Sequence, residues 1–474
     1  MSSLKFGTSG LRGLVTDLVG RPSYAYAAAF FASVGGEAGS GREVVIGRDL
    51  RSSSAEIAAT VATAAAAAGL VAIDCGPLPT PALALEARRR GACAVMVTGS
   101  HIPEDRNGLK FYRPDGEITK ADEAAILAAL GDVAAGAPLP PVVPAEPEPD
   151  AIARYRRRYL DAFKADTLTG QKIAVYQQSS VARDLLVDLL EALGADVSPI
   201  GRSETFVPID TEAHRPEDVA FIRDVMASGR FDALVTTDGD ADRPLIADGT
   251  GRIVRGDVLG LITARYLGAD AVVVPVTAGS AIERAGGFRQ VRRTRVGSPF
   301  VIAGMEQAER DGATIVCGFE ANGGFLLGSD SPVGDEILPA LPTRDAVLPI
   351  LATLAAARQA AMPLADLVVT LDVGETASNR LPNVAAERSG ALLRQLKDEA
   401  FRRDFLRPVG EPGAVDEQDG VRIELDGART IHFRPSGNAP ELRCYAEAKS
   451  AAEAEDLVRW GLAAAAAVME HNAG

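Results

Sequence analysis

The chain has 474 residues, of which 47% are hydrophobic and 24% charged, and its formal net charge is −15. A chain of this length is too long for one hydrophobic core, so we expect a soluble globular protein of roughly three or four domains. Because nucleic acids and anionic membranes bind basic surfaces, the acidic balance argues against both classes of partner.

Two further features bear on where the protein works. The opening MSSLKFGTSGLRG has no apolar signal core, and the alanine-rich runs at 58–68 and 463–468 are too short to span a bilayer. The cysteines are scattered without a Cys-x-x-Cys pair, which favours free thiols over a zinc or redox site. We therefore expect a cytoplasmic protein.

The first motif in chain order is FGTSGLRG at residues 6–13. Its glycines allow backbone N–H groups to approach an anion closely, and Arg12 supplies a planar charged fork. The Gly-Lys-Ser/Thr ending of a P-loop is missing, so the motif predicts an anion site of another kind. A purely structural glycine-rich turn is the alternative.

Helical and strand patterns then alternate up to a serine-containing loop. The predicted elements are helices near 24–34, 55–68 and 81–90, and strands near 43–49, 70–74 and 92–97. This alternation is typical of a doubly wound α/β fold, in which ligands bind beyond the carboxyl ends of buried strands. Ser100 follows the last apolar run, so we expect it in a binding crevice; an ordinary strand-to-loop turn is the alternative.

Two residues near Ser100 are candidates for its chemistry. Lys110 lies ten residues further on, near enough for one loop to return to the same crevice. His101 is adjacent to Ser100, but adjacent residues rarely supply the geometry of a catalytic triad. There is also no Gly-x-Ser-x-Gly motif, so a serine hydrolase is disfavoured.

A second α/β unit follows a break in the pattern. The segment 131–150 is rich in proline and alanine and is predicted to be a linker, and 155–163 is predicted to be a surface helix with a solvated arginine run. The second unit then consists of strand 172–176, helix 181–193 and strand 232–236.

The loop after that second unit is acidic. Asp238, Asp240 and Asp242 alternate in a tight turn, where their charges repel unless a cation or strong donors neutralise them. The glycine and glutamate of an EF-hand are absent, which excludes that type of calcium site. Mg²⁺ completed by a phosphate fits this carboxylate set, and an exposed acidic turn is the alternative.

A third unit is predicted from strand 271–275, a helix near 300–310 and strand 314–316, followed by the loop 318–324. Within that loop, Glu320 and Asn322 are able to hydrogen-bond sugar hydroxyls. The α/β unit thus occurs three times, each time with a polar or glycine-rich loop after a buried strand.

The pattern changes from about residue 368 to that of a smaller α+β domain. Strands 421–425 and 430–433 flank the hairpin turn signal Asp426-Gly427, and strand 444–448 precedes a final helix opened by a capping box at Ser450 and Glu453. Between them, Arg434, Ser436, Asn438 and Arg443 form a donor set suited to a phosphate dianion, with a surface loop as the alternative.

Taken in order, these loops resemble the signature loops of the α-D-phosphohexomutases, and the resemblance covers essentially the whole chain. The matching segments are FGTSGLRG (6–13) for the N-terminal loop, TGSHIP (98–103) for the phosphoserine loop, DGDADR (238–243) for the metal loop, EANGG (320–324) for the sugar-recognition loop and RPSGNAPELR (434–443) for the phosphate-binding loop.

The resemblance implies a fold of three related doubly wound α/β domains and a smaller C-terminal α+β domain around a central cleft. The implied boundaries are 1–150 for the domain with the phosphoserine loop, 151–256 for the one with the metal loop, 257–366 for the one with the sugar loop and 367–474 for the one with the phosphate-binding loop.

The resemblance also implies a reaction. Phosphorylated Ser100 donates its phosphoryl group to a hexose phosphate, giving a hexose 1,6-bisphosphate that turns over in the cleft and returns the other phosphoryl group; this bisphosphate is also the expected activator. Such transfer depends on positioning and charge neutralisation, here aided by Mg²⁺. The implied site residues are Ser100, Lys110, Arg12 and His101 for catalysis; Ser100, Asp238, Asp240 and Asp242 for the metal; and Arg243, Glu320, Asn322, Arg434, Ser436, Gly437, Asn438 and Arg443 for the substrate.

Some positions depart from the family pattern. Gly99 and Ile102 flank Ser100-His101 where alanine and asparagine are frequent, and Ala241 stands where glycine is usual. Gly324 replaces a frequent histidine, and Ser298 stands in a loop that often carries histidine or lysine.

The variants TGSHIP, TASNRLP (376–382) and RPSGNAPELRCY resemble most the bacterial phosphomannomutase branch. We therefore predict interconversion of mannose 6-phosphate and mannose 1-phosphate. A phosphoglucomutase or a dual-specificity enzyme is the alternative, and a non-catalytic sugar-phosphate-binding protein is a distant one. The expected partner is a small phosphosugar, with no nucleic acid and no membrane, and the expected assembly is a monomer or a homodimer.

Overall fold

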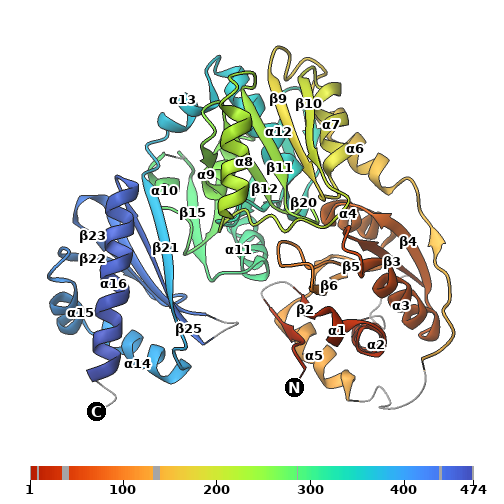
Figure 1. The fold of residues 1–474 in the computed structure, drawn as a ribbon, viewed down its shortest axis with the longest axis horizontal. Coiled ribbons are helices and arrows are strands. Elements are labelled where there is room, and N and C mark those ends of the chain that lie inside the picture. Colours follow the sequence, from red (N-terminus) through yellow and green to blue (C-terminus); the bar gives the residue numbers. More distant parts are fainter. Residues whose placement is uncertain are drawn as a thin grey trace. The chain divides into compact units, whose positions relative to one another are not determined.

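The structure is a computed structural model (Figure 1). It describes residues 2–7, 10–34, 42–131, 139–285, 287–436 and 440–471. Its contacts divide the chain into two compact units. The first unit comprises Met1–Val273 and Gly297–Val368, and the second comprises Val274–Val296 and Val369–Gly474. The two units are described separately below.

The N-terminal part of the first unit is built on a mixed eight-stranded sheet with the order β1-β2-β6-β5-β3-β4-β8, in which β7 pairs with β6. Its elements are β1 (Lys5–Phe6), β2 (Leu11–Leu14), α1 (Val15–Leu18), α2 (Arg21–Val34), β3 (Glu43–Arg48), α3 (Ser54–Ala67), β4 (Val71–Pro77), α4 (Thr80–Arg90), β5 (Cys93–Val97), β6 (Arg106–Arg113), β7 (Gly116–Glu117), α5 (Lys120–Leu130) and β8 (Glu146–Pro147).

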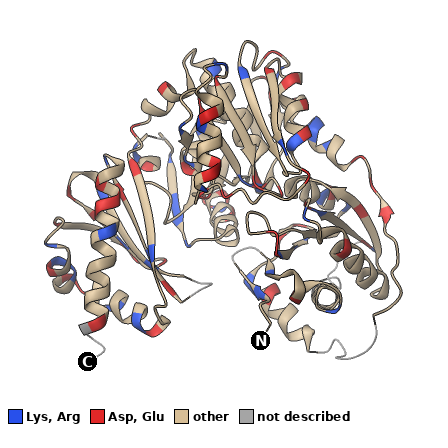
Figure 2. Cartoon of the chain, in the orientation of Figure 1, with Lys and Arg blue, Asp and Glu red and all other residues tan. Residues whose placement is uncertain are grey.

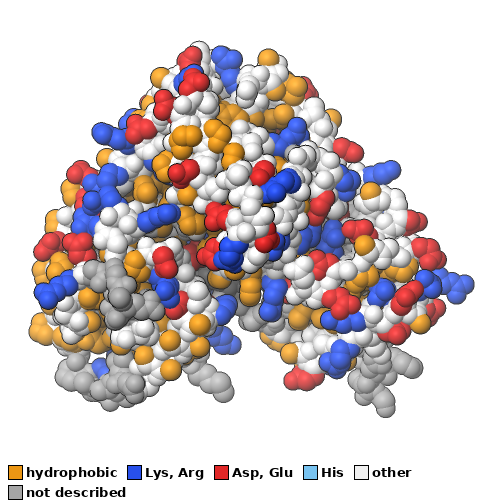
Figure 3. Space-filling model, turned by 180° about the vertical axis from the view of Figure 1, so that it is seen from behind, with side chains coloured by type: hydrophobic (Ala, Val, Ile, Leu, Met, Phe, Trp, Pro, Cys, Tyr) orange, Lys and Arg blue, Asp and Glu red, His pale blue; other side chains and the backbone are white. Residues whose placement is uncertain are grey.

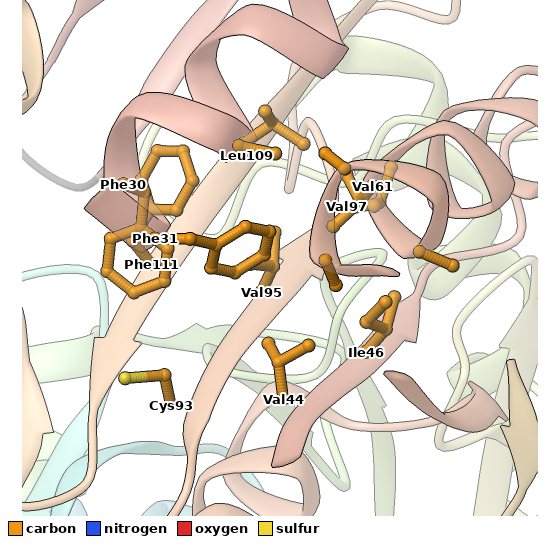
Figure 4. Close-up of a cluster of buried hydrophobic side chains, with 14 of the residues drawn as sticks. Phe30, Phe31, Val44, Ile46, Val61, Cys93, Val95, Val97, Leu109 and Phe111 are labelled. Atoms are coloured by element: carbon orange, nitrogen blue, oxygen red, sulfur yellow. The ribbon is translucent and has the colours of Figure 1, made fainter. Parts of the chain in front are cut away.

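This sheet owes its stability to an apolar core on one side. Figure 4 shows Phe30 and Phe31 of α2 converging with Phe111 of β6 and with valines of β3 and β5. The ring centroids of Phe30 and Phe111 are 4.8 Å apart. Each such fully buried side chain contributes about 1.5–3 kcal/mol to the free energy of unfolding. The continuous apolar run of β5 is buried at every position, as its sequence indicates.

The next part of the first unit contains a five-stranded sheet with the order β10-β9-β11-β12-β13. Its elements are α6 (Ala151–Ala162), β9 (Lys172–Gln178), α7 (Arg183–Ala192), β10 (Asp196–Arg202), α8 (Pro216–Met226), β11 (Ala233–Thr237), β12 (Pro244–Asp248) and β13 (Ile253–Val254). Strands β9, β10 and β11 are parallel, whereas β12 and β13 are antiparallel to their neighbours.

A third sheet has the order β15-β14-β16-β17-β20. The elements of this region are α9 (Gly256–Tyr266), β14 (Ala271–Pro275), α10 (Ala281–Ala285), β15 (Gln290–Thr294), α11 (Ser298–Arg310), β16 (Val316–Phe319), β17 (Phe325–Leu327), β18 (Ser331–Val333), β19 (Glu336–Leu338), β20 (Leu341–Asp345), α12 (Val347–Gln359) and α13 (Leu364–Val369). Strands β18 and β19 form a separate hairpin.

The three sheets share one plan that places the predicted loops at equivalent positions. Strands β5, β11 and β16 each pair in parallel with an earlier strand, and each is followed by a strand that runs back antiparallel to it. The connections between them are 98–105, 238–243 and 320–324. The threefold α/β organisation expected from the sequence is confirmed in this topology.

The C-terminal part of the second unit is an antiparallel five-stranded sheet with the order β21-β25-β24-β23-β22. Helices pack against this sheet, and side chains from both form the core. Its elements are β21 (Glu375–Pro382), α14 (Ala386–Lys397), α15 (Glu399–Leu406), β22 (Pro412–Asp416), β23 (Val421–Leu425), η1 (Asp426–Ala428), β24 (Arg429–Pro435), β25 (Glu441–Ala448) and α16 (Ala451–His471). The hairpin expected at Asp426-Gly427 joins β23 to β24, and Ser450 Oγ accepts a hydrogen bond from the Glu453 N–H at the start of α16.

Three expectations need correction. The helix expected at 155–163 begins at Ala151 and is only partly a surface helix: Arg157 is exposed, but Tyr155 and Tyr159 are buried and Arg158 is only 9% exposed. The strand expected at 314–316 lies at Val316–Phe319 instead. The predicted linker also contributes β8, which pairs in parallel with β4.

Acidic and basic side chains are distributed over helices, loops and strands (Figure 2). On the face shown in Figure 3, acidic and basic side chains are interspersed. Among the described residues, no helix is both long and apolar enough to cross a membrane. All four cysteines are buried and unpaired by disulfides, as expected.

Candidate functional site

Ser100 follows β5 and has an unusual backbone conformation. Its φ is +55°, a left-handed conformation that few non-glycine residues adopt and that occurs preferentially at functional sites. Arg51 stabilises this turn, because its Nη2 donates to the carbonyl oxygens of Ser100 at 2.9 Å and Ile102 at 2.7 Å. The Ser100 N–H donates to Thr98 Oγ1 at 2.8 Å, and the Thr98 hydroxyl donates to Asp49. The serine is therefore held by contacts to its backbone.

The Ser100 side chain points into a cluster of charged groups. Its hydroxyl donates to Asp238 Oδ2 at 2.6 Å and lies 3.2 Å from Nδ1 of His101. Arg243 Nη1 lies 3.0 Å from the same Nδ1. Because a guanidinium only donates, His101 Nδ1 is the unprotonated ring nitrogen. Burial and the positive charges of Arg243 and Arg12 hold the pKa of His101 far below its usual value, so the imidazole is neutral.

The acidic loop lies between β11 and β12 and is fully buried. Asp238, Asp240 and Asp242 offer carboxylate oxygens within 4.8 Å of one another. The backbone N–H groups of Asp242 and Arg243 both donate to Asp238 Oδ1 at 3.2 Å, which fixes the turn. Ala241 has φ +57°, which explains physically why glycine suits this position.

Cations and a hydroxyl converge on two of these aspartates. Lys110 Nζ donates to Asp240 at 2.6 Å and to Asp242 at 2.5 Å, and Thr80 Oγ1 donates to Asp240 at 2.5 Å. Arg344 Nη2 lies 2.9 Å from Asp242 Oδ2. Lys110 reaches the site because β6 runs antiparallel to β5 with Lys110 opposite Met96. Lys110 therefore lies at the acidic loop whose Asp238 contacts Ser100.

The same arrangement separates the pKa values of the carboxyls. Burial, together with repulsion from Asp240 and Asp242, raises the pKa of Asp238 well above its usual value. Burial acts in the same direction on Asp242, but Arg344, Lys110 and Arg243 outweigh it and lower that pKa below its usual value. Burial and the neighbouring arginines 243 and 344 lower the pKa of Arg12 to about 10, where it remains charged at neutral pH.

The donor set fits a divalent cation. Asp240 Oδ1 and Asp242 Oδ1 are buried and have no hydrogen-bond partner among the described residues. Oxygen ligands such as carboxylates are those that Mg²⁺ prefers, and buried carboxylate oxygens that accept no hydrogen bond are costly. Within the described part of the chain, these three aspartates are the group of metal-ligating side chains that is compact enough for an ion.

The loop after β16 brings a further carboxylate close to the acidic loop. Glu320 is 5% exposed, and its Oε2 lies 3.2 Å from Arg344 Nη1. Asn322 Oδ1 accepts from the Gly324 N–H at 3.0 Å, so this amide shapes its own loop. Ser298 begins α11 and donates to Glu117 Oε2 at 2.6 Å. Glu320 of the loop 320–324 therefore contacts the same arginine, Arg344, as Asp242 of the acidic loop does.

The predicted phosphate-binding residues belong to the second unit. Arg434 is 9% exposed at the end of β24, and its Nε donates to Asp419 Oδ2 at 2.9 Å. The Ser436 N–H donates to the Glu441 carbonyl at 2.9 Å, which closes the loop between β24 and β25. Arg443 lies on β25, with Nε 3.8 Å from Glu441. Gly437 and Asn438 lie outside the described residues.

Within the first unit, the structure brings together most residues that the sequence singled out. Direct contacts link Ser100, His101, Lys110, Asp238, Asp240, Asp242 and Arg243, and Arg344 connects Glu320 to them. Arg51, Thr80 and Arg344 also belong to this cluster and were not predicted from the sequence. Each lies near the carboxyl end of a strand, β3, β4 or β20, so the rule that singled out Ser100 also applies to them.

Comparison with known proteins agrees with this geometry. Three models of the phosphoglucomutase/phosphomannomutase family match the chain: alpha/beta/alpha domain I at residues 3–135, alpha/beta/alpha domain III at 255–371 and the C-terminal domain at 383–459. A phosphomannomutase of Sinorhizobium fredii is 49% identical over 97% of this chain and 98% of its own.

A phosphomannomutase of Salmonella muenchen is 43% identical over 96% of this chain and 94% of its own. Among solved structures, a phosphoglucomutase/phosphomannomutase family protein of Burkholderia thailandensis aligns with a TM-score of 0.76 over 97% of both chains at 21% identity. At that level of identity, the structural match supports the fold alone.

Proposed function

Since the chain belongs to the phosphoglucomutase/phosphomannomutase family and is thus a phosphohexomutase, we propose that it is a phosphomannomutase, which interconverts mannose 6-phosphate and mannose 1-phosphate. The observation that carries this choice of sugar is the 49% and 43% identity, over nearly the whole chain, to two relatives that both bear the name phosphomannomutase.

We assign Ser100 as the carrier of the phosphoryl group. In the forward half-reaction, a hydroxyl oxygen of the hexose phosphate forms a bond to phosphorus, the bond from phosphorus to Ser100 Oγ breaks, and a hexose 1,6-bisphosphate results. In the second half-reaction, Ser100 Oγ takes the other phosphoryl group back. The contact between Ser100 Oγ and Asp238 and the charged groups around it support this role.

The site residues fit Mg²⁺ as cofactor, held by Asp238, Asp240, Asp242 and an oxygen on Ser100. When bound, Mg²⁺ neutralises charge that develops on the transferring phosphoryl group. The protein's own part is to keep these carboxylates buried and to orient that of Asp238 through the N–H groups of Asp242 and Arg243.

The remaining residues bind and orient the reacting groups. The attacking hydroxyl loses a proton and Ser100 Oγ gains one, and we assign this exchange to Lys110 Nζ. Arg12 orients the phosphoryl group; its buried Nη2 has no acceptor among the described residues, so an anion would satisfy it. His101 serves as a neutral acceptor that positions Arg243.

In substrate binding, Arg243 contacts the reacting phosphate. Glu320 accepts hydrogen bonds from sugar hydroxyls, and the side-chain amide of Asn322 donates to them. The other phosphate is bound by the loop of the second unit, through Arg434, Ser436, Gly437, Asn438 and Arg443. The four-domain division at 1–150, 151–256, 257–366 and 367–474 stays part of this proposal, as does the bisphosphate as activator.

The proposal is tested by turnover and by mass. We expect purified protein with Mg²⁺ to convert mannose 1-phosphate to mannose 6-phosphate with a higher kcat/KM than glucose 1-phosphate. Ser100→Ala removes the oxygen that carries the phosphoryl group and should lower kcat at least about a thousandfold. Mass spectrometry of the peptide containing Ser100 should show one added phosphate in the wild-type protein.

Ser52→Ala is the matched control, because Ser52 is exposed and its hydroxyl contacts Glu104 outside the cluster. A higher kcat/KM for glucose 1-phosphate would identify a phosphoglucomutase, and equal values a dual-specificity enzyme. Undiminished turnover by Ser100→Ala would refute the phosphoserine mechanism.

A further inference from the structure

Arg344 joins two loops that carry different parts of the proposed reaction. It lies on β20, is 2% exposed, and contacts Asp242 of the acidic loop at 2.9 Å and Glu320 of the sugar loop at 3.2 Å. These are contacts of Nη2 and Nη1, so the two ends of one planar guanidinium serve two carboxylates. A planar fork of this kind fixes the orientation of its partners more strictly than an ammonium does.

Gly324 is what gives Arg344 its room. A Cβ placed on residue 324 would lie 2.8 Å from Cδ of Arg344, 3.0 Å from its Cγ and 3.1 Å from the carbonyl oxygen of Asp242. The strand pairing explains this closeness, because Phe325 at the start of β17 lies opposite Asp345 at the end of β20. A side chain at 324 and the present position of Arg344 therefore exclude each other.

The same contacts determine how Glu320 can meet a substrate. With Oε2 engaged by Arg344, the carboxylate of Glu320 is held in one orientation within its loop. Hydroxyl groups of epimeric sugars differ in direction, so a carboxylate of fixed orientation discriminates between them more strongly than a mobile one. Arg344 also neutralises both carboxylates. If it were removed, Glu320 and Asp242 would be buried like charges that no longer share a cation.

We propose that Arg344 is a positioning residue that sets sugar specificity: with Gly324 leaving its space open, it orients Glu320 toward the sugar hydroxyls and ties that loop to Asp242. This inference rests on the proposed phosphomannomutase function. Arg344 and Gly324 act together, because Arg344 reaches Glu320 only when residue 324 has no side chain.

The first test replaces the fork by a point charge. Arg344→Lys keeps a cation but cannot engage both carboxylates in the same geometry. We expect KM for mannose 1-phosphate to rise about tenfold with kcat changed less than about threefold, since the contact to the sugar is made in ground state and transition state alike. The ratio of kcat/KM for mannose 1-phosphate over glucose 1-phosphate should move toward one. Arg310→Lys, an exposed arginine of α11, is the matched control and should change neither value.

The second test is a double-mutant cycle. Gly324→Ala should raise KM because its Cβ displaces the Arg344 side chain. In the Arg344→Ala background, a Cβ at 324 keeps only its 3.1 Å contact with the Asp242 carbonyl oxygen, so adding Gly324→Ala should raise KM much less than it does in the wild type. Such non-additivity is the signature of two residues acting through one contact. Additive effects on KM would overturn the proposal.

A binding measurement separates this proposal from the proposed function. In the Ser100→Ala background, which does not turn over, calorimetry should give a dissociation constant for mannose 1-phosphate about tenfold higher with Arg344→Lys than without it. Unchanged binding and unchanged KM, or an effect confined to kcat, would refute the role of Arg344. Wild-type protein that binds mannose 1-phosphate but turns over neither hexose phosphate would refute the proposed function instead, and the binding comparison would still decide the role of Arg344. Thermal unfolding identifies a variant that fails to fold, and Gly324→Ala then tests the same contact with Arg344 present.

Discussion

At the scale of single residues, the turn at Ser100 depends on an arginine far away in the sequence. Gly99 has no Cβ, and one placed there would lie 2.6 Å from Nε of Arg51. The Arg51 guanidinium also stacks on Phe206, with Cζ 3.7 Å from the ring centroid. Glycine at 99 therefore lets Arg51 lie directly beneath the loop and hold the Ser100 carbonyl. This is a physical reason for the departure at 99 noted in the sequence.

We predict that Arg51→Lys lowers kcat by roughly tenfold to a hundredfold, because lysine cannot donate to two carbonyl oxygens and stack on Phe206 at the same time. A displacement of the reacting oxygen of about 1 Å suffices for a loss of this size. Steady-state kinetics with saturating substrate measures it. Arg48→Lys serves as the control, because Arg48 ends β3, three residues before Arg51, and pairs with Asp74. Equal kcat values for the two variants would contradict the prediction.

At the scale of elements, an ion-pair cluster joins α4 to α6. Glu86 on α4 is 1% exposed and accepts hydrogen bonds from Arg89 at 2.7 Å, Arg90 at 2.6 Å and Arg154 of α6 at 2.9 Å. Arg90 also contacts Glu148, next to β8. The end of the predicted linker is thus attached to the first sheet by β8 and by the ion pairs of Glu148 with Arg90 and Arg154.

This cluster makes stability depend on pH. Burial alone would raise the pKa of Glu86, but the hydrogen bonds from Arg89, Arg90 and Arg154 outweigh burial and lower it to about 2. A folded-state pKa below the unfolded value stabilises the protein above about pH 4.5, and this stabilisation, roughly 3 kcal/mol, is lost as the pH falls toward 2. We predict that Glu86→Gln removes this contribution, so that its urea-unfolding free energy falls less steeply between pH 5 and pH 3 than that of the wild type.

The control is Glu56→Gln, since Glu56 is exposed on α3. A slope for Glu86→Gln equal to that of Glu56→Gln would show that Glu86 is not the titrating group.

At the scale of the whole molecule, the second unit is assembled from two separate stretches of chain. The short stretch Val274–Val296 contributes Ser280, whose N–H and hydroxyl both donate to Glu447 Oε2, at 2.9 and 2.6 Å. Glu447 lies on β25 and is 4% exposed. The same stretch contributes the Val296 N–H, which donates to Asp419, the partner of Arg434. Two acidic side chains of the C-terminal part, Glu447 and Asp419, therefore take hydrogen bonds from residues far upstream.

We predict that Ser280→Ala destabilises the second unit by about 1–3 kcal/mol, because a buried carboxylate loses a donor. Hydrogen exchange should become about tenfold or more faster for amides of β24 and β25, and stay unchanged for β3 and β5. Ser228→Ala, an exposed serine of the first unit, is the control. Unchanged exchange in β24 and β25 would contradict the prediction.

The order of elements and the main loops could be predicted from sequence because their signals are local. Ser100, the three aspartates and Glu320 each follow a short apolar run, and strand periodicity depends on neighbours within a few residues. The hairpin at Asp426-Gly427 likewise depends on the turn preferences of two residues. For the same reason the burial of Tyr155 and Tyr159 was missed, since both hydroxyls donate to Asp345 almost two hundred residues later.

The sequence by itself therefore determined the repeated α/β order, most strands that lead into the site, and which loops carry carboxylates, a serine and arginines. Only the tertiary structure decided the pairs: Ser100 with Asp238, Lys110 with Asp240 and Asp242, and Arg344 with Asp242 and Glu320. The physical reason is one of range. Periodicity and turn chemistry act over a few residues, whereas these ion pairs follow from sheet register and side-chain packing between strands distant in the chain.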